Sequence, residues 1–272
     1  MKIHYFFKEI AVFSAVFVFL LLPSLSQGAV REGAFSAWNF PFQQFVFMAF
    51  SFFFIAFELN LYSFSSLKNF LFQPFSKNNL KRGMSFFFLG FAALAALAFF
   101  FQILAGFVLD DGRKSQNLNF TAPENVKTWI FCILTFFSGA ILEENIFRLY
   151  LPAFFRKLFP QKYLSGFLSA VPEFFPCILF ALCHRYLGLF AVLNAFSAHI
   201  VLRLMFFRTS SPVLNYSVHF FYNILNVIFM IAAKNWAEKC FHDSEKTSIS
   251  RPYVHPLISA EKSQCLFLYV SM

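Results

Sequence analysis

Long apolar segments alternate with shorter polar ones along most of the sequence. A transmembrane helix needs about 20 mostly apolar residues, and most of the apolar segments reach that length. The first lies within residues 1–28. The others lie at residues 40–64, 85–109, 128–155, 163–184, 187–207 and 212–233. This pattern predicts an all-α, polytopic transmembrane helical bundle of about seven membrane helices.

The N-terminal stretch supports two interpretations. Residues 1–28 contain Lys2 and Lys8, an apolar run at 10–22, and then small residues. That order is typical of a first transmembrane helix and also of a secretory signal peptide. We expect an uncleaved helix, with cleavage as the alternative. The rest of the chain is expected to divide into N-terminal membrane helices at 29–127, a core at 128–233 and a polar C-terminal tail at 234–272.

Composition and charge also indicate a membrane protein. The chain is 59% hydrophobic and 13% charged, whereas a soluble domain carries about 25% charged residues. The net charge of +9 fits cations in cytoplasmic loops beside anionic lipid, so we expect no nucleic-acid partner. Basic residues gather in the loops at 64–84, 156–162 and 203–212. They predict a multi-pass protein of the cytoplasmic (inner) membrane, with its N-terminus inside and its C-terminus outside.

Three charged residues interrupt the apolar run at 128–155. Glu143, Glu144 and Arg148 would together cost about 7–10 kcal/mol at the centre of a membrane helix. The eleven large apolar residues around them return only about 3–7 kcal/mol. The charged face should therefore point into a protein interior or a water-filled cavity that other helices provide.

The two adjacent glutamates differ in what their own helix offers them. Glu144 and Arg148 are four residues apart, so they share a helix face and can pair. We interpret this pair as part of a packing network. Glu143 points about 100° away and has no cation nearby in sequence. We therefore expect Glu143 to be functional, with partners that come from later helices.

Each of two later predicted helices carries a histidine four residues away from another residue that could share its helix face. Phe180 precedes His184 by four residues, and His219 precedes Asn223 by four. Other polar residues of the apolar segments are interpreted as packing, interfacial or structural: His199, Glu58 and Glu173. The expected helix ends place His184, Glu143 and His219 at different depths. A common site would therefore require the fifth segment to be displaced or tilted.

Together these residues could perform hydrolysis. A glutamate and a histidine can hold and deprotonate a water, and neutral His219 and Asn223 suit a developing oxyanion. Glu143, His184 and His219 could also hold Zn²⁺ with one position open, so a metal and a metal-free site both stay open. The H-E-x-x-H pattern of zincins is absent. The five cysteines form no C-x-x-C pair, which indicates neither a disulfide framework nor a cysteine zinc site.

The order of these motifs resembles a known family. Glu143-Glu144-x-x-x-Arg148, Phe180-x-x-x-His184 and His219-x-x-x-Asn223 follow one another on successive predicted helices. They are similar to the three motifs of the CPBP intramembrane proteases, which include the type II CAAX prenyl endopeptidases and the bacterial Abi, or bacteriocin-processing, proteins. The stretch at 207–211, Phe-Arg-Thr-Ser-Ser, also resembles the Arg-Thr-Gly-Ser turn common in that family. The resemblance covers about residues 128–233, the CPBP-like catalytic core.

The resemblance implies a role for each matching residue. Glu143 would act as general base on the attacking water, and His184 would hold that water. His219 and Asn223 would stabilise the tetrahedral oxyanion. Glu144, Arg148 and Phe180 would shape the site. The family is named as metalloproteases, yet a metal-free glutamate mechanism is also argued for it.

The resemblance also implies the partners. The substrate would be a prenylated, lipidated or otherwise hydrophobic peptide or protein, cleaved at the lipid bilayer.

One alternative function is that of a non-catalytic membrane protein that binds a peptide, such as an immunity or scaffold protein. The other is a proton-coupled transporter that uses Glu143 and Glu144 as cation sites. The absence of internal repeats and of paired broken helices argues against a transporter.

Overall fold

The chain is a multi-pass helical membrane bundle. The computed structural model describes residues 3–26, 40–72, 80–108, 122–159 and 169–249, and no strand occurs among them. The elements are α1 (Ile3–Val16), η1 (Phe17–Leu21), α2 (Leu22–Ser26), α3 (Phe42–Glu58), α4 (Phe64–Phe72), α5 (Leu80–Val108), α7 (Val126–Glu143), η4 (Glu144–Tyr150), α8 (Leu151–Leu158), α9 (Val171–Cys183), η7 (Arg185–Leu187), α10 (Leu189–Thr209) and α11 (Pro212–Ile249). The prediction of an all-α bundle is confirmed.

Five helical stretches in the described part of the chain are long and apolar enough to cross a bilayer: Phe7–Ser26, Lys81–Phe101, Val126–Leu158, Leu189–Thr209 and Pro212–Ala232. The other two predicted segments form shorter apolar helices, α3 with 17 residues and α9 with 13. A helix of 13 residues spans about 20 Å, less than the ~30 Å hydrocarbon core. The fifth segment is therefore shorter than predicted.

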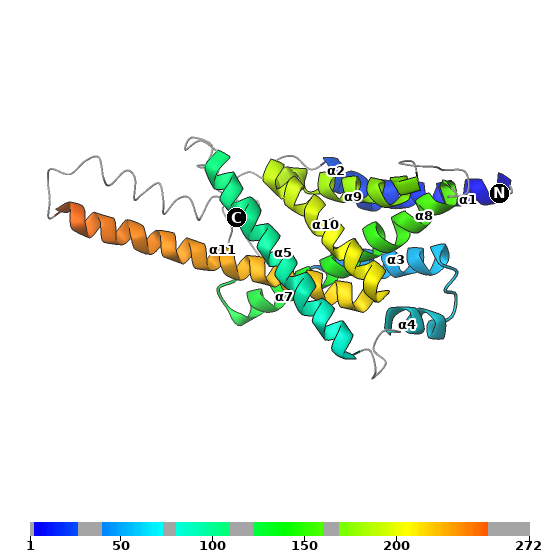
Figure 1. Ribbon diagram of the computed structural model, residues 1–272, viewed down its shortest axis with the longest axis horizontal. Helices are drawn as coiled ribbons and strands as arrows, with labels where there is room; N and C mark the ends of the chain where they lie inside the picture. The colour runs from blue at the N-terminus through cyan, green and yellow to red at the C-terminus, as the bar shows by residue number, and fades with distance from the viewer. Residues whose placement is uncertain (1–2, 27–39, 73–79, 109–121, 160–168, 250–272) are drawn as a thin grey trace.

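The start of α9 and the end of α11 also differ from the predicted boundaries. Helix α9 begins at Val171, and Pro172 lies in its first turn, where a proline is tolerated because that N–H has no helical partner. The predicted helical residues 163–168 lie outside the described residues. At the other end, α11 continues to Ile249, beyond the expected start of the polar tail at 234, and projects past the other helices (Figure 1).

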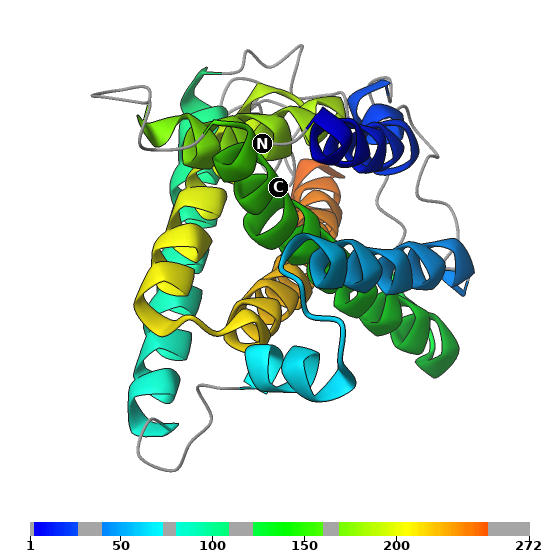
Figure 2. The ribbon, with the colours of Figure 1, turned by 90° about the vertical axis from the view of Figure 1, so that its right-hand side faces the viewer.

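The central element is the continuous helix α7–η4–α8. Helix α3 packs against α7 and η4, α9 packs against η4 and α8, and α11 packs against α7. Helices α5 and α10 run side by side across the bundle (Figures 1 and 2). The stretch that carries Glu144 and Arg148 is thus surrounded by protein, as the cost of burying its charges requires.

Local sequence explains how this central helix begins and changes pitch. The Asn125 side chain accepts a hydrogen bond from the Thr128 backbone N–H, and Thr128 Oγ1 accepts one from the Asn125 N–H, which forms a capping box. After Glu143 the helix widens into the π-helical segment η4. Such segments occur frequently at functional sites.

A short turn between α10 and α11 sets the start of the last helix. Ser210 has φ 51° and ψ 26°, the left-handed conformation that glycine adopts without strain. Thr209 Oγ1 accepts a hydrogen bond from the Ser211 N–H, and Ser211 Oγ accepts one from the Leu214 N–H. The turn therefore fixes the first residues of α11, the helix that presents His219.

Two glutamates outside the motifs join helices together. Glu173 on α9 pairs with Arg156 on α8 and with Arg203 on α10, with an Oε2–Nε distance of 2.6 Å for Arg203, which agrees with its structural interpretation. The interfacial interpretation of Glu58 is wrong: it is 1% exposed and its Oε1 lies 2.9 Å from Lys157 Nζ. Its partner Lys157 lies 99 residues further along the chain, so the sequence around Glu58 did not indicate it.

Candidate functional site

Glu144 is the most completely satisfied member of the site. It is 1% exposed, and its Oε1 lies 2.6 Å from Arg148 Nη1 and 2.7 Å from His219 Nδ1. Its Oε2 accepts a hydrogen bond of 3.2 Å from Asn215 Nδ2. The predicted pair with Arg148 is present, and α11 supplies two further partners. We call Glu143, Glu144, Arg148 and His219 the motif cluster.

The contacts of Glu144 determine the proton position on His219. A carboxylate held this closely by a guanidinium is ionised and accepts only. His219 Nδ1, 2.7 Å from the same Oε1, must therefore carry a proton and donate it. The carboxylate thus fixes both the tautomer and the orientation of the ring. Nε2 of His219 is left for chemistry on the other side of the ring.

That other side of the ring faces Glu143. The distance from His219 Nε2 to Glu143 Oε2 is 3.5 Å. The Glu143 side chain is 33% exposed, whereas Glu144 is buried, so the two neighbouring carboxylates occupy opposite environments. Glu143 has no cation on its own helix turn and finds its partner on α11. The structure thus brings together the glutamate and one of the two histidines of the predicted set.

Phe180 connects the three motifs. Its ring centroid lies 4.7 Å from that of His184 and 6.5 Å from that of His219. The Arg148 guanidinium carbon lies 4.8 Å from the same centroid, a cation–π distance. The short helix α9 therefore reaches the motif cluster through the apolar side chain of Phe180, whose site-shaping role stays a prediction. This contact brings the fifth segment to the site despite its different helix ends.

His184 lies at the end of α9 rather than within a helix. It caps the helix, and its Nδ1 lies 2.9 Å from the Phe180 carbonyl oxygen, so this nitrogen donates and Nε2 stays available. The negative charge of Glu143 also acts on η7, the turn that follows His184. Burial, together with the charge of Glu143, raises the pKa of Tyr186 in η7 to about 12.

The possible metal set does not form in the structure. Across the described residues, no three His, Cys, Asp or Glu side chains converge in a way that could hold a metal ion, and this includes Glu143, His184 and His219. In both histidines the nitrogen with a protein partner is Nδ1, which faces Glu144 in His219 and the Phe180 carbonyl in His184. Metal-ligating histidines also have such a partner, so these hydrogen bonds do not decide the matter. The described side chains do not fit a zinc ion because three donor groups do not converge on one point.

Two further polar residues lie near the motif cluster. Asn223 is half-buried, one turn after His219 on α11. His199 on α10 is buried, and its ring centroid is 5.4 Å from that of Phe180. This contact agrees with a packing role for His199. Among the described residues, neither of its ring nitrogens has a hydrogen-bond partner.

Sequence reasoning missed several residues that support the site. Asn215 donates to Glu144 and also to the Leu202 carbonyl. The spacing could have revealed it, because Asn215 precedes His219 by four residues and so shares its helix face. A second buried link joins α3, η4 and α11. Asn145 Nδ2 donates to Ser51 Oγ at 2.8 Å, and the Tyr216 hydroxyl donates to Asn145 Oδ1.

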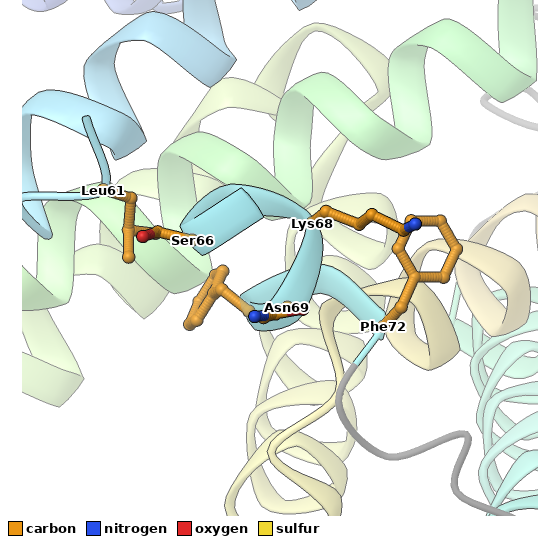
Figure 3. A pocket seen from close by; sticks show the side chains of 6 residues that line it. Leu61, Ser66, Lys68, Asn69 and Phe72 are labelled. Atoms are coloured by element: carbon orange, nitrogen blue, oxygen red, sulfur yellow. The ribbon is translucent and has the colours of Figure 1, made fainter. Parts of the chain in front are cut away.

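A surface pocket lies apart from the motif cluster. Its volume is about 500 Å³, and it is lined by Leu61, Ser66, Lys68, Asn69, Phe70 and Phe72. Figure 3 shows these side chains around α4. None of the motif residues lines it, so the site is identified by its side-chain geometry and not by this pocket.

Part of the chain matches a protein-family model. Residues 125–225 match the family model described as "Type II CAAX prenyl endopeptidase Rce1-like". The match includes all three motifs and the turn between α10 and α11. No curated protein and no solved structure matches the chain significantly.

Proposed function

The chain belongs, through residues 125–225, to the CPBP family of intramembrane proteases, and from this premise we propose what it cleaves and how. The substrate is a prenylated, lipidated or hydrophobic peptide, hydrolysed at the membrane. The basic loops favour the cytoplasmic membrane as its location. The observation that carries the proposal is the placement of His219 between two glutamates, with Nδ1 at Glu144 and Nε2 at Glu143.

In this proposal Glu143 is the general base. A water that hydrogen-bonds to Glu143 and to His184 loses a proton to the Glu143 carboxylate as its oxygen attacks the scissile carbonyl carbon. The partial exposure of Glu143 suits a group that must meet water and substrate. Glu143 then returns the proton to the leaving amine as the C–N bond breaks, so the carboxylate is regenerated.

His219 and Asn223 stabilise the tetrahedral oxyanion. Glu144 accepts the Nδ1 proton of His219 and so turns Nε2 toward the site. In place of the neutral donor expected from the sequence, we propose a doubly protonated ring whose charge Glu144 offsets. Its Nε2 donates to the oxyanion and keeps its proton throughout the reaction. Asn223, one turn further along α11, supplies an amide N–H₂ as the second donor. Removing one such donor typically costs about 10²–10³ in kcat. No step is assigned to a metal, because the donor geometry does not fit one.

The test is a cleavage assay in proteoliposomes. A prenylated peptide ending in a CAAX sequence, the same peptide without the prenyl group, and an apolar peptide are compared as substrates. We expect cleavage of at least one of them, and loss of it in Glu143→Ala, His184→Ala and His219→Ala. Glu124→Gln, an exposed glutamate outside the motifs, serves as the control. Full retention of cleavage in the three alanine variants would contradict the assignment.

A further inference from the structure

The N-terminal segment, defined as residues 3–26, packs against the elements that carry the site although it lies outside the family match. Buried Val16 and Leu21 belong to the same apolar cluster as Phe147, Tyr150 and Phe180. The Phe13 ring stacks on Phe154, with centroids 4.6 Å apart and planes at 3°. In Figures 1 and 2, α1 and α2 run beside α9.

Apolar burial alone does not explain this docking in a membrane. Lipid tails are as apolar as the helix surfaces, so helix association in a bilayer depends on close packing and polar links. Among the described side chains, an ion cluster and a hydrogen bond link the segment to the rest of the chain. Each joins it to an element next to the motif cluster, and each involves a charged side chain.

The first link is an ion cluster, which we call the clasp: Glu9, Lys157 and Glu58. Lys157 Nζ on α8 lies 3.2 Å from Glu9 Oε1 on α1 and 2.9 Å from Glu58 Oε1 on α3. Glu9 is 4% exposed and Glu58 1%. A carboxylate in an apolar helix is costly unless it is paired. One lysine therefore ties α1 and α3 to the helix that continues from η4.

The second link reaches the turn that carries His184. Arg185 Nε donates a hydrogen bond of 2.8 Å to the Leu25 carbonyl oxygen of α2. Arg185 opens η7 directly after His184, and Gly188 with φ 100° ends the turn. Within the segment, the link thus lies at the end opposite the clasp and beside the residue expected to hold the attacking water.

We propose that the N-terminal segment stays in the folded protein as a positioning element of the proteolytic unit. The clasp anchors its first half, and the Leu25 carbonyl holds the His184 turn through Arg185, a positioning residue. This role rests on the proposed function only for its catalytic readout. The geometry predicts that loss of the Arg185 link moves the bound water and leaves the fold intact.

The first test measures kcat and KM for Arg185→Met and Arg185→Lys. We expect kcat to fall about 10-fold in Arg185→Met, since small misplacements of reacting groups cost up to ~10²-fold, with KM and thermal midpoint close to wild type. Arg185→Lys keeps a donor and should recover most of the rate. Arg82→Met, another exposed arginine, is the matched control. Equal kcat in wild type and Arg185→Met, or no recovery in Arg185→Lys, would overturn the positioning role.

The second test needs no activity. A specific protease site is inserted between residues 27 and 39, the purified full chain is cut there, and an N-terminal tag is used to recover the segment. We expect residues 40–272 to be recovered with it from wild type, and recovery to fall in the double variant Glu9→Gln with Lys157→Met. The inference would be overturned if the two pieces of the otherwise unsubstituted protein separated after cutting. It would also be overturned if the purified protein began after residue 26. If the wild-type protein cleaved none of the peptide substrates, that result would instead count against the proposed function.

Discussion

The motif cluster and the clasp each contain two glutamates. In the motif cluster one of the two is partly exposed, whereas in the clasp both are buried. In the motif cluster, Glu144 has three polar partners while Glu143 is one-third exposed and faces a histidine. In the clasp, Glu9 and Glu58 are both buried and share one lysine.

The difference separates chemistry from assembly. A buried carboxylate whose partners are all protein groups joins helices and orients its neighbours. A carboxylate that keeps an open side can take a proton from water. Within the motif cluster the two duties fall on adjacent residues, whereas the clasp has only the first. Substitutions that remove one carboxylate at a time can therefore break or sharpen the comparison.

The largest effect is expected for Glu143→Gln. The amide cannot accept the proton of the water, so kcat should fall by about 10²–10⁴, the contribution of a general base. The fold should persist, because the buried Arg148 keeps its ion pair with Glu144. Cleavage rate and thermal midpoint in detergent are measured together, with Glu124→Gln as the control. A large loss of thermal stability with Glu143→Gln would place it with Glu144 as a structural group.

Glu144→Gln should show the opposite division. It leaves the buried Arg148 guanidinium without its counter-charge, and breaking a buried pair costs about 3–5 kcal/mol of unfolding free energy. Activity should fall too, because the tautomer of His219 is no longer fixed. The measurement is the denaturation midpoint of Glu144→Gln beside that of Glu143→Gln. Equal midpoints would remove the distinction between the two carboxylates.

Lys157→Met should destabilise the protein less than Glu144→Gln. It leaves Glu9 and Glu58 unpaired, but the Lys157 side chain is 34% exposed, so water can reach part of the clasp. We expect a loss of about 1–3 kcal/mol, below the value for a fully buried pair. Lys68→Met, an exposed lysine on α4, is the control. The clasp would lose its anchoring role if the two variants unfolded at the same midpoint.

Local spacing made the motif cluster predictable. The pairing of Glu144 with Arg148 follows from a separation of four residues on one helix, and the structure contains it. The isolation of Glu143 on its own helix was predicted by the same spacing. That it would face His219 depended on the order of motifs on later helices, and the structure places the two 3.5 Å apart.

The clasp could not be predicted in this way. Glu58 and Lys157 are 99 residues apart, and no periodicity links residues of different helices. Each looked interfacial or loop-like because it lies at the end of an apolar run. The short length of α9 was missed for a different reason: the run at 163–184 was interpreted as one helix although Pro172, a residue typical of a first helical turn, lies inside it. Tertiary contacts, which local patterns do not encode, decided the clasp.

The smallest effect is a gain in stability, expected from Ser210→Gly in the turn that leads to His219. Relief of the left-handed conformation at φ 51° is worth about 1–2 kcal/mol, and glycine costs ~0.5–1 kcal/mol in chain entropy. The net gain should be roughly 0.5–1 kcal/mol. Ser217→Gly, inside α11, is the control and should lose stability, because there glycine adds entropy to the unfolded chain and removes the hydrogen bond from Ser217 Oγ to the Val213 carbonyl. Both are measured by denaturation in detergent. If Ser210→Gly also lost stability, the turn would not be held in the strained conformation, and the position of His219 would have to depend on its contact with Glu144 instead of on the start of its helix.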